Sequence, residues 1–162
     1  MSIRVYVPSS TLRLRDLLVS GGIGPVPVLA HAVTDLVRTT LADVGEEEWE
    51  YAALTAAAQD SLALLGEDEP PRRVVVVAEA DSAVPVAGPD ASLVELDEVV
   101  PLRRVVAVHV DSDEAAEDVA AARAAWAQGD EDDQAAADAL DRCLDHELGW
   151  FATQEIGDLI PE

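Results

Sequence analysis

The stretch Arg73-Val-Val-Val-Val-Ala78 decides the fold. Four consecutive valines are β-branched and leave no polar face, which is typical of a strand covered on both sides. The segment from Val105 to Val110 repeats this pattern and predicts a second interior strand. Length alone does not distinguish such a run from a segment of a buried helix, and the interior strand is the interpretation adopted here.

Weaker signals on either side of these runs predict the remaining elements. Further strands are expected at 3–7, 28–33 and, at an edge of the sheet, 93–97. Helices are expected near 11–20, 34–44, 46–65 and 112–126, with a final long helix from about 131 to 156. Asp111 and Glu114 have the spacing of an acidic capping box at the start of one of these helices.

Helices that alternate with strands indicate the α/β class, with α+β as the alternative. The sequence therefore predicts a mixed sheet of four or five strands with some parallel pairs, crossover helices and a C-terminal helical hairpin. A length of 162 residues fits one globular domain, spanning 1–162.

The charge limits the partners that the protein can bind. Acidic residues number 33 against ten basic ones, all arginine, for a net charge of −23. Proteins bind nucleic acids and anionic membranes through clustered basic residues, which this acidic chain lacks. We therefore do not expect the protein to bind either of them directly. A basic protein partner is compatible with this charge. The most acidic run is Asp130-Glu131-Asp132-Asp133, in the C-terminal helical region, and it marks a candidate binding surface. The oligomeric state is left open.

We expect a cytoplasmic protein without a cofactor. Cys143 is the single cysteine, which excludes an intramolecular disulfide and suits a reducing compartment. The N-terminus lacks the pattern of a signal peptide, and no apolar run is long enough for a membrane helix. The glycines of Gly21-Gly22-Ile-Gly24 follow a helix, whereas a nucleotide-binding loop follows a strand.

The residues with the most chemistry lie near the C-terminus. On one long helix, Cys143, His146, Trp150 and Gln154 would share a stripe, with Glu147 beside them. His146 and Glu147 are candidates for acid–base catalysis, and Cys143 beside His146 for a nucleophile. Trp150 and Gln154 are candidate binding residues. A metal site that combines Cys143 and His146 with a strand histidine lacks dense ligand spacing, so no metal is predicted.

His31 and His109 lie in apolar strands, where a hydrogen-bonded core histidine is the common outcome. Both are also candidates to complete a binding site near His146. The same structural interpretation applies to His146, Glu147 and Gln154, which would then bond to loops at the rim of the core.

Several short segments resemble a known family. They are Arg4-Val-Tyr-Val-Pro8 with Thr11-Leu12, Ala32-Val-Thr34, Glu50-Tyr51-Ala-Ala53, Val108-His109-Val110-Asp111, His146-Glu147-Leu and Trp150-Phe-Ala-Thr-Gln-Glu155. Together they are similar to a family of small, acidic, uncharacterised proteins from GC-rich actinobacteria. The family has no assigned activity, so the resemblance implies an actinobacterial cytoplasmic protein and no catalytic residue.

Two functions remain open. The first is a non-enzymatic protein that binds a basic protein partner through its acidic helical surface. The alternative is a small enzyme or small-molecule-binding protein with a pocket built from His146, Glu147, Trp150 and Gln154. The two differ in geometry, because the alternative requires these four side chains to converge on a pocket that solvent can reach.

Overall fold

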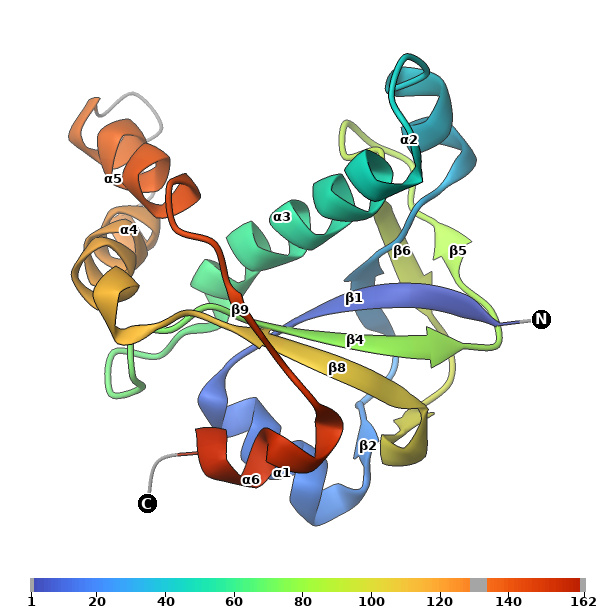
Figure 1. The fold of residues 1–162 in the computed structure, drawn as a ribbon, viewed down its shortest axis with the longest axis horizontal. Helices are drawn as coiled ribbons and strands as arrows, with labels where there is room; N and C mark the ends of the chain where they lie inside the picture. The colour runs from blue at the N-terminus through green and yellow to red at the C-terminus, as the bar shows by residue number, and fades with distance from the viewer. Residues whose placement is uncertain (1, 129–133, 161–162) are drawn as a thin grey trace.

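A seven-stranded sheet forms the centre of the computed structural model, which describes residues 2–128 and 134–160 (Figure 1). Its strand order is β5-β6-β3-β1-β4-β8-β9. The strands are β1 (Ile3–Ser9), β3 (Val28–His31), β4 (Val74–Ala80), β5 (Val84–Pro85), β6 (Leu93–Leu96), β8 (Val105–Val110) and β9 (Gly149–Phe151). The short strands β2 (Gly22–Ile23) and β7 (Val100–Pro101) pair separately.

The α/β class is confirmed, and all five predicted strands lie in this sheet. The two additional strands, β5 and β9, form its short edges. The predicted parallel pairs are wrong, because every strand pair among the described residues is antiparallel. The connections from β1 to β3 and from β8 to β9 contain helices but join neighbouring antiparallel strands. The connection from β3 to β4 passes β1, so these two strands run in the same direction without pairing.

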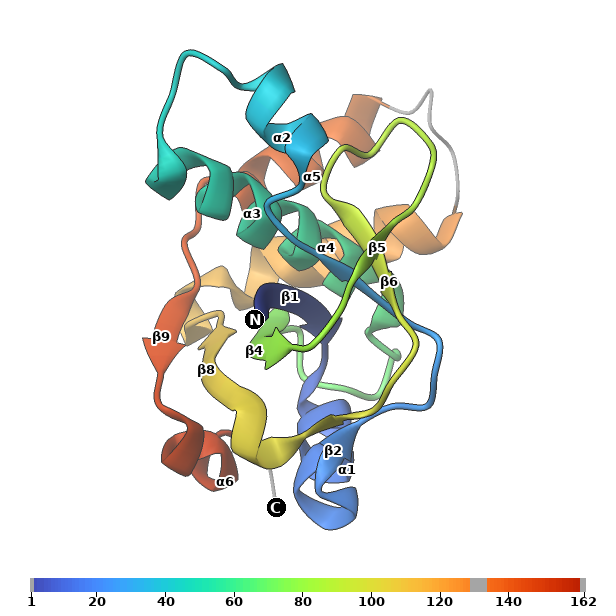
Figure 2. The same ribbon diagram turned by 90° about the vertical axis from the view of Figure 1, so that its right-hand side faces the viewer.

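The valine run is buried on both faces, as its composition predicts. Val74 and Val76 pack into one core, together with α1 (Thr11–Ser20) and α6 (Ile156–Leu159). Val75 and Val77 pack into a second core, against α3 (Glu46–Leu64). Figures 1 and 2 show α1 and α6 on one side of the sheet and α3 on the other. α2 (Asp35–Thr40) precedes α3.

Local signals fix the first helix. The Ser10 side chain accepts a hydrogen bond from the Arg13 backbone N–H, which caps the helix start. Gly21 ends α1 in the left-handed conformation with φ 80°, and its N–H donates to the Leu17 carbonyl. Both ends therefore fall where the sequence places them.

The predicted C-terminal hairpin is formed by α4 (Ala116–Gln128) and α5 (Gln134–Leu144). The hairpin packs on the C-terminal end of α3 through Leu62 and Val119. The long helix expected over 131–156 is wrong, because α5 ends at Leu144. The chain then continues as β9, the 3-10 turn η3 (Thr153–Glu155) and α6. Residues 149–151 pair with β8 instead, a tertiary contact that helical periodicity does not detect.

A buried ion pair fixes this change of direction. Arg73 Nε and Nη2 donate to the two carboxylate oxygens of Asp111 at 2.8 and 2.9 Å. Arg73 Nη2 also donates to the His146 carbonyl at 3.0 Å, which anchors the segment between α5 and β9. The predicted capping box of Asp111 and Glu114 is wrong, since the Asp111 carboxylate bonds to Arg73 and the helix start shows no side-chain cap.

Candidate functional site

A groove lies between the N-terminal half of α3 and strands β1, β8 and β9. It has a volume of about 480 Å³. Its polar and aromatic lining includes Tyr6, Glu47, Glu50, Tyr51, His109 and Trp150, and we call it the aromatic groove. Two of the predicted binding residues, His109 and Trp150, thus meet in one site.

Sheet register and helix periodicity place these side chains together. His109 of β8 is the register partner of Trp150 of β9, so both project from the same face of the sheet. Tyr6 projects from β1 on that face and packs in the core under α3. Glu47, Glu50 and Tyr51 are three and four residues apart in the first turns of α3, so they lie on one side of the helix.

The aromatic groove carries two carboxylates and uncharged rings. Burial lowers the pKa of His109, so its imidazole is neutral at physiological pH, and its buried Nδ1 has no hydrogen-bond partner among the described residues. Burial, with a smaller contribution from Glu50, raises the pKa of Tyr6 to about 12. Arg4 also lines the groove, but its guanidinium is paired with Glu79 at 3.2 Å. Glu47 and Glu50 therefore set the sign of the local field.

The other C-terminal candidates lie elsewhere. His146 Nε2 is 2.7 Å from Asp118 Oδ2, and the buried Cys143 Sγ donates to the Asp118 carbonyl at 3.2 Å. The hydrogen bond with His146 lowers the pKa of Asp118, and burial raises the pKa of the Cys143 thiol. These contacts join α4 to the end of α5. A raised pKa and a buried sulfur are typical of an inert thiol.

None of the pockets described here is lined by all four residues of the enzyme alternative. Glu147 and Gln154 are exposed, Gln154 lies in the 3-10 turn after β9, and Trp150 alone lines the aromatic groove. The helical stripe that grouped them does not exist, because the chain leaves the helix at Leu144. The acidic run Asp130-Glu131-Asp132-Asp133 lies outside the described residues.

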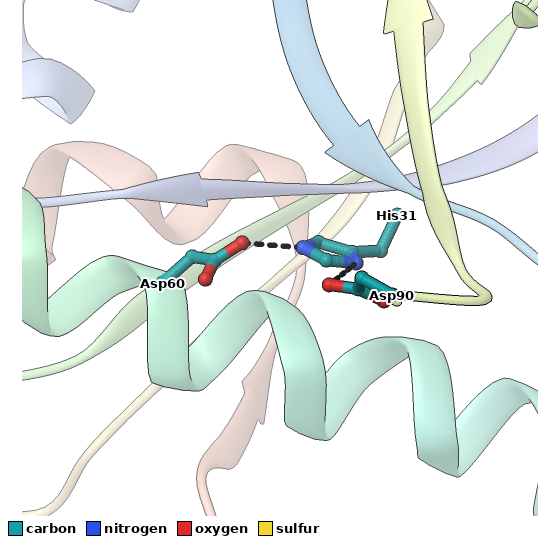
Figure 3. A group of neighbouring side chains, drawn as sticks. All are labelled: His31, Asp60 and Asp90. Carbon is teal, nitrogen blue, oxygen red and sulfur yellow. Dashed lines mark hydrogen bonds and ion pairs between the residues drawn. The ribbon is translucent and has the colours of Figure 1, made fainter. Parts of the chain in front are cut away.

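A second cluster surrounds His31, which is completely buried (Figure 3). Its Nε2 is 2.6 Å from Asp60 Oδ2, and its Nδ1 is 2.7 Å from Ser92 Oγ and 3.8 Å from Asp90 Oδ2. Asp60 and Asp90 also line a pocket of about 1310 Å³, the largest of those described here. Two carboxylates from distant segments thus meet one histidine of β3.

Some residues of the aromatic groove and of the His31 cluster could have been identified from the sequence. Asp60 falls on the stripe of Ala53 and Ala57 along α3, and an acid on an apolar stripe indicates a buried polar partner. Glu50 and Tyr51 belong to a segment that carries the family resemblance. Nothing local predicts Asp90, which reaches His31 from the loop before β6.

The architecture defines a small α/β protein, with an antiparallel sheet covered by helices on both faces and two clusters of polar side chains. No helix in the described part of the chain combines the length and apolar character that crossing a membrane requires. The chain belongs to a family of unknown function, DUF6912, whose model matches residues 3–160. The chain matches no curated protein and no solved structure.

Proposed function

We propose that the protein binds a basic protein partner and that the aromatic groove receives an arginine or lysine side chain of that partner. The observation that carries the proposal is the convergence of Trp150, Tyr51 and Tyr6 with two carboxylates around one open groove. The partner class is the one that the net charge of −23 favours.

The chemistry of the aromatic groove fits a cation on a flexible stem. Aromatic faces attract ammonium and guanidinium groups through the ring quadrupole, by about 0.5–2 kcal/mol depending on desolvation. Glu47 and Glu50 add carboxylate acceptors at the rim, and the neutral His109 adds no opposing charge. The apolar floor includes Leu54 and Val77, which suits the methylene stem of a basic side chain.

The open shape favours a side chain presented by a protein over a free small cation. Trp150 is 62% exposed and Tyr51 is 54% exposed. Rings this exposed do not enclose a small ligand, but they are covered when a partner surface packs over them, and buried aromatic residues dominate the energy of such interfaces. The remaining negative charge of the protein would steer a basic partner towards this face.

A peptide titration followed by NMR tests the proposal. The probe is a (Gly-Arg)4 peptide, compared with a (Gly-citrulline)4 peptide of the same length that lacks the charge. We expect the arginine peptide to shift the Trp150 indole N–H and to bind the Trp150→Ala variant about 2- to 30-fold more weakly, which is the range that a lost cation–π contact predicts. Glu50→Gln is also expected to weaken binding.

Two matched variants separate the aromatic groove from the general negative charge. Trp126→Ala removes an exposed tryptophan on α4, and Glu114→Gln removes an exposed carboxylate before that helix. Both should leave binding near the wild-type value at moderate salt. The proposal fails if the citrulline peptide binds equally well, or if the two control variants weaken binding as much as Trp150→Ala and Glu50→Gln do.

We place this interaction in the cytoplasm. The support is the single cysteine of the chain, Cys143, which is buried and unpaired in the structure and so suits a reducing compartment.

A further inference from the structure

The His31 cluster brings one imidazole and two carboxylates together on separate segments. His31 comes from β3, Asp60 from α3 and Asp90 from the loop before β6 (Figure 3). One ligand atom from each residue lies within 4.8 Å of the other two. The imidazole is fully buried, whereas the Asp60 and Asp90 side chains are 44% and 41% exposed and line the large pocket.

The hydrogen bonds around Ser92 determine which ring nitrogen carries a proton. The Ser92 hydroxyl donates to Asp90 Oδ1 at 3.0 Å, so its oxygen accepts from His31 Nδ1–H at 2.7 Å. His31 Nε2 then faces Asp60 Oδ2 at 2.6 Å. Two lone pairs at that distance repel each other, so a proton lies between them. A metal ion with bonds of about 2.0–2.2 Å to each atom would replace this proton once the Asp60 carboxylate moves to about 3.3 Å from Nε2.

The negative side chains around the His31 cluster favour a ligand that carries more than one positive charge. A protonated imidazole supplies a single positive charge to Asp60 and Asp90, and the lining of the large pocket adds Asp16 and Glu69 against Arg13. A divalent ion would balance both carboxylates of the cluster. A histidine ligand whose second nitrogen is fixed by a hydrogen bond is the usual arrangement in metal sites, and Ser92 supplies that bond here.

We propose that His31 Nε2, Asp60 and Asp90 bind one divalent transition-metal ion of the zinc class at the wall of the large pocket. Mixed nitrogen and carboxylate ligands suit Zn²⁺, and three protein ligands are the number found in zinc sites that keep a position open for water or substrate. Asp60 and Asp90 both line the pocket, so an ion can reach the cluster from it. Ser92 is a positioning residue, because it bonds to His31 and Asp90.

Calorimetric titration with Zn²⁺ and ¹⁵N NMR of the histidine rings test this site without any assay of activity. We expect one Zn²⁺ per chain and a shift of His31 Nε2. Asp60→Asn and Asp90→Asn keep the side-chain shape and should weaken binding at least tenfold. Ser92→Ala should weaken it about 10- to 100-fold, as the loss of a bond to a metal ligand does. Circular dichroism verifies that each variant is folded.

The controls separate this site from other ligands. Asp16→Asn changes another acid of the same pocket and should leave Zn²⁺ affinity unchanged, and so should His146→Ala. The proposal is overturned if Zn²⁺ does not bind stoichiometrically, if His146 or His109 shifts in place of His31, or if the Asn variants bind as the wild type does. The Gly-Arg peptide test concerns different residues, so either proposal can fail alone.

Discussion

The buried ion pair between Arg73 and Asp111 yields the sharpest prediction about stability. The Arg73 side chain is 4% exposed and the Asp111 side chain 0%. The Asp111 carboxylate accepts three hydrogen bonds from Arg73, from the backbone N–H, Nε and Nη2, at 2.8–2.9 Å. Asp111→Ala removes all three and leaves a guanidinium buried with only the His146 carbonyl as an acceptor.

We expect Asp111→Ala to lower the free energy of unfolding by about 3–5 kcal/mol, the usual cost of breaking a buried pair. In a chain of this size that corresponds to a fall in Tm of about 6–20 °C. Urea unfolding followed by far-UV circular dichroism measures the first quantity, and a thermal scan measures the second. The double variant Arg73→Met with Asp111→Leu should be much less destabilised, because no charge is left unpaired.

The exposed pair of Arg104 and Asp81 is the matched control. Asp81 is 66% exposed, so Asp81→Ala should cost at most about 1 kcal/mol. A loss below about 1 kcal/mol in Asp111→Ala, or a double variant as unstable as the single one, would refute the reasoning. Asp111→Ala should also broaden the Trp150 indole resonance, since Arg73 anchors the segment that leads into β9.

Three further predictions concern single residues. Gly21→Ala places a Cβ at φ 80°, which should cost about 1–2 kcal/mol in urea unfolding, and an unchanged midpoint would contradict the left-handed cap. Because burial lowers the folded pKa of His109 below 6.5, the unfolded chain binds the proton first, and stability falls as the pH drops through 6.5. His109→Leu should flatten that fall between pH 7 and 5, and an unaltered slope would assign it to other groups. Cys143, whose pKa is raised by burial, should react with a thiol reagent far more slowly in the native protein than in guanidinium chloride, and equal rates would show an exposed thiol.

The sequence correctly predicted the elements whose structure depends on residues within them or directly beside them. The valine run cannot expose either face, so an interior strand is its only stable position. Ser10 and Gly21 mark the ends of α1 because a capping hydroxyl and a left-handed residue act within one turn. The valine run and the two capping residues act on residues close to them in the sequence, so distant contacts do not change the elements that they predict.

The C-terminal segment was predicted wrongly because its structure depends on distant residues. Residues 145–156 have a helical spacing of apolar side chains, but Arg73 binds the His146 carbonyl and β8 provides an open edge for residues 149–151. These contacts outweigh a weak helical preference that includes Gly149. The same limit applies to the sites, since His109 and Trp150 are brought together by sheet pairing and not by helical spacing.

The aromatic groove and the His31 cluster share one helix and one strand pair. Tyr6 of the groove is the register partner of His31 where β1 pairs with β3. α3 carries Glu50 and Tyr51 towards its start and Asp60 towards its end. An ion bound by both His31 and Asp60 would fix the same helix that positions the rim of the groove. We therefore expect Zn²⁺ and the Gly-Arg peptide to alter each other's affinity, and thermodynamic linkage requires that the two factors be equal. Unequal factors would mean that one ligand binds at a further site, whereas a factor of one would show that α3 is held in place without the ion.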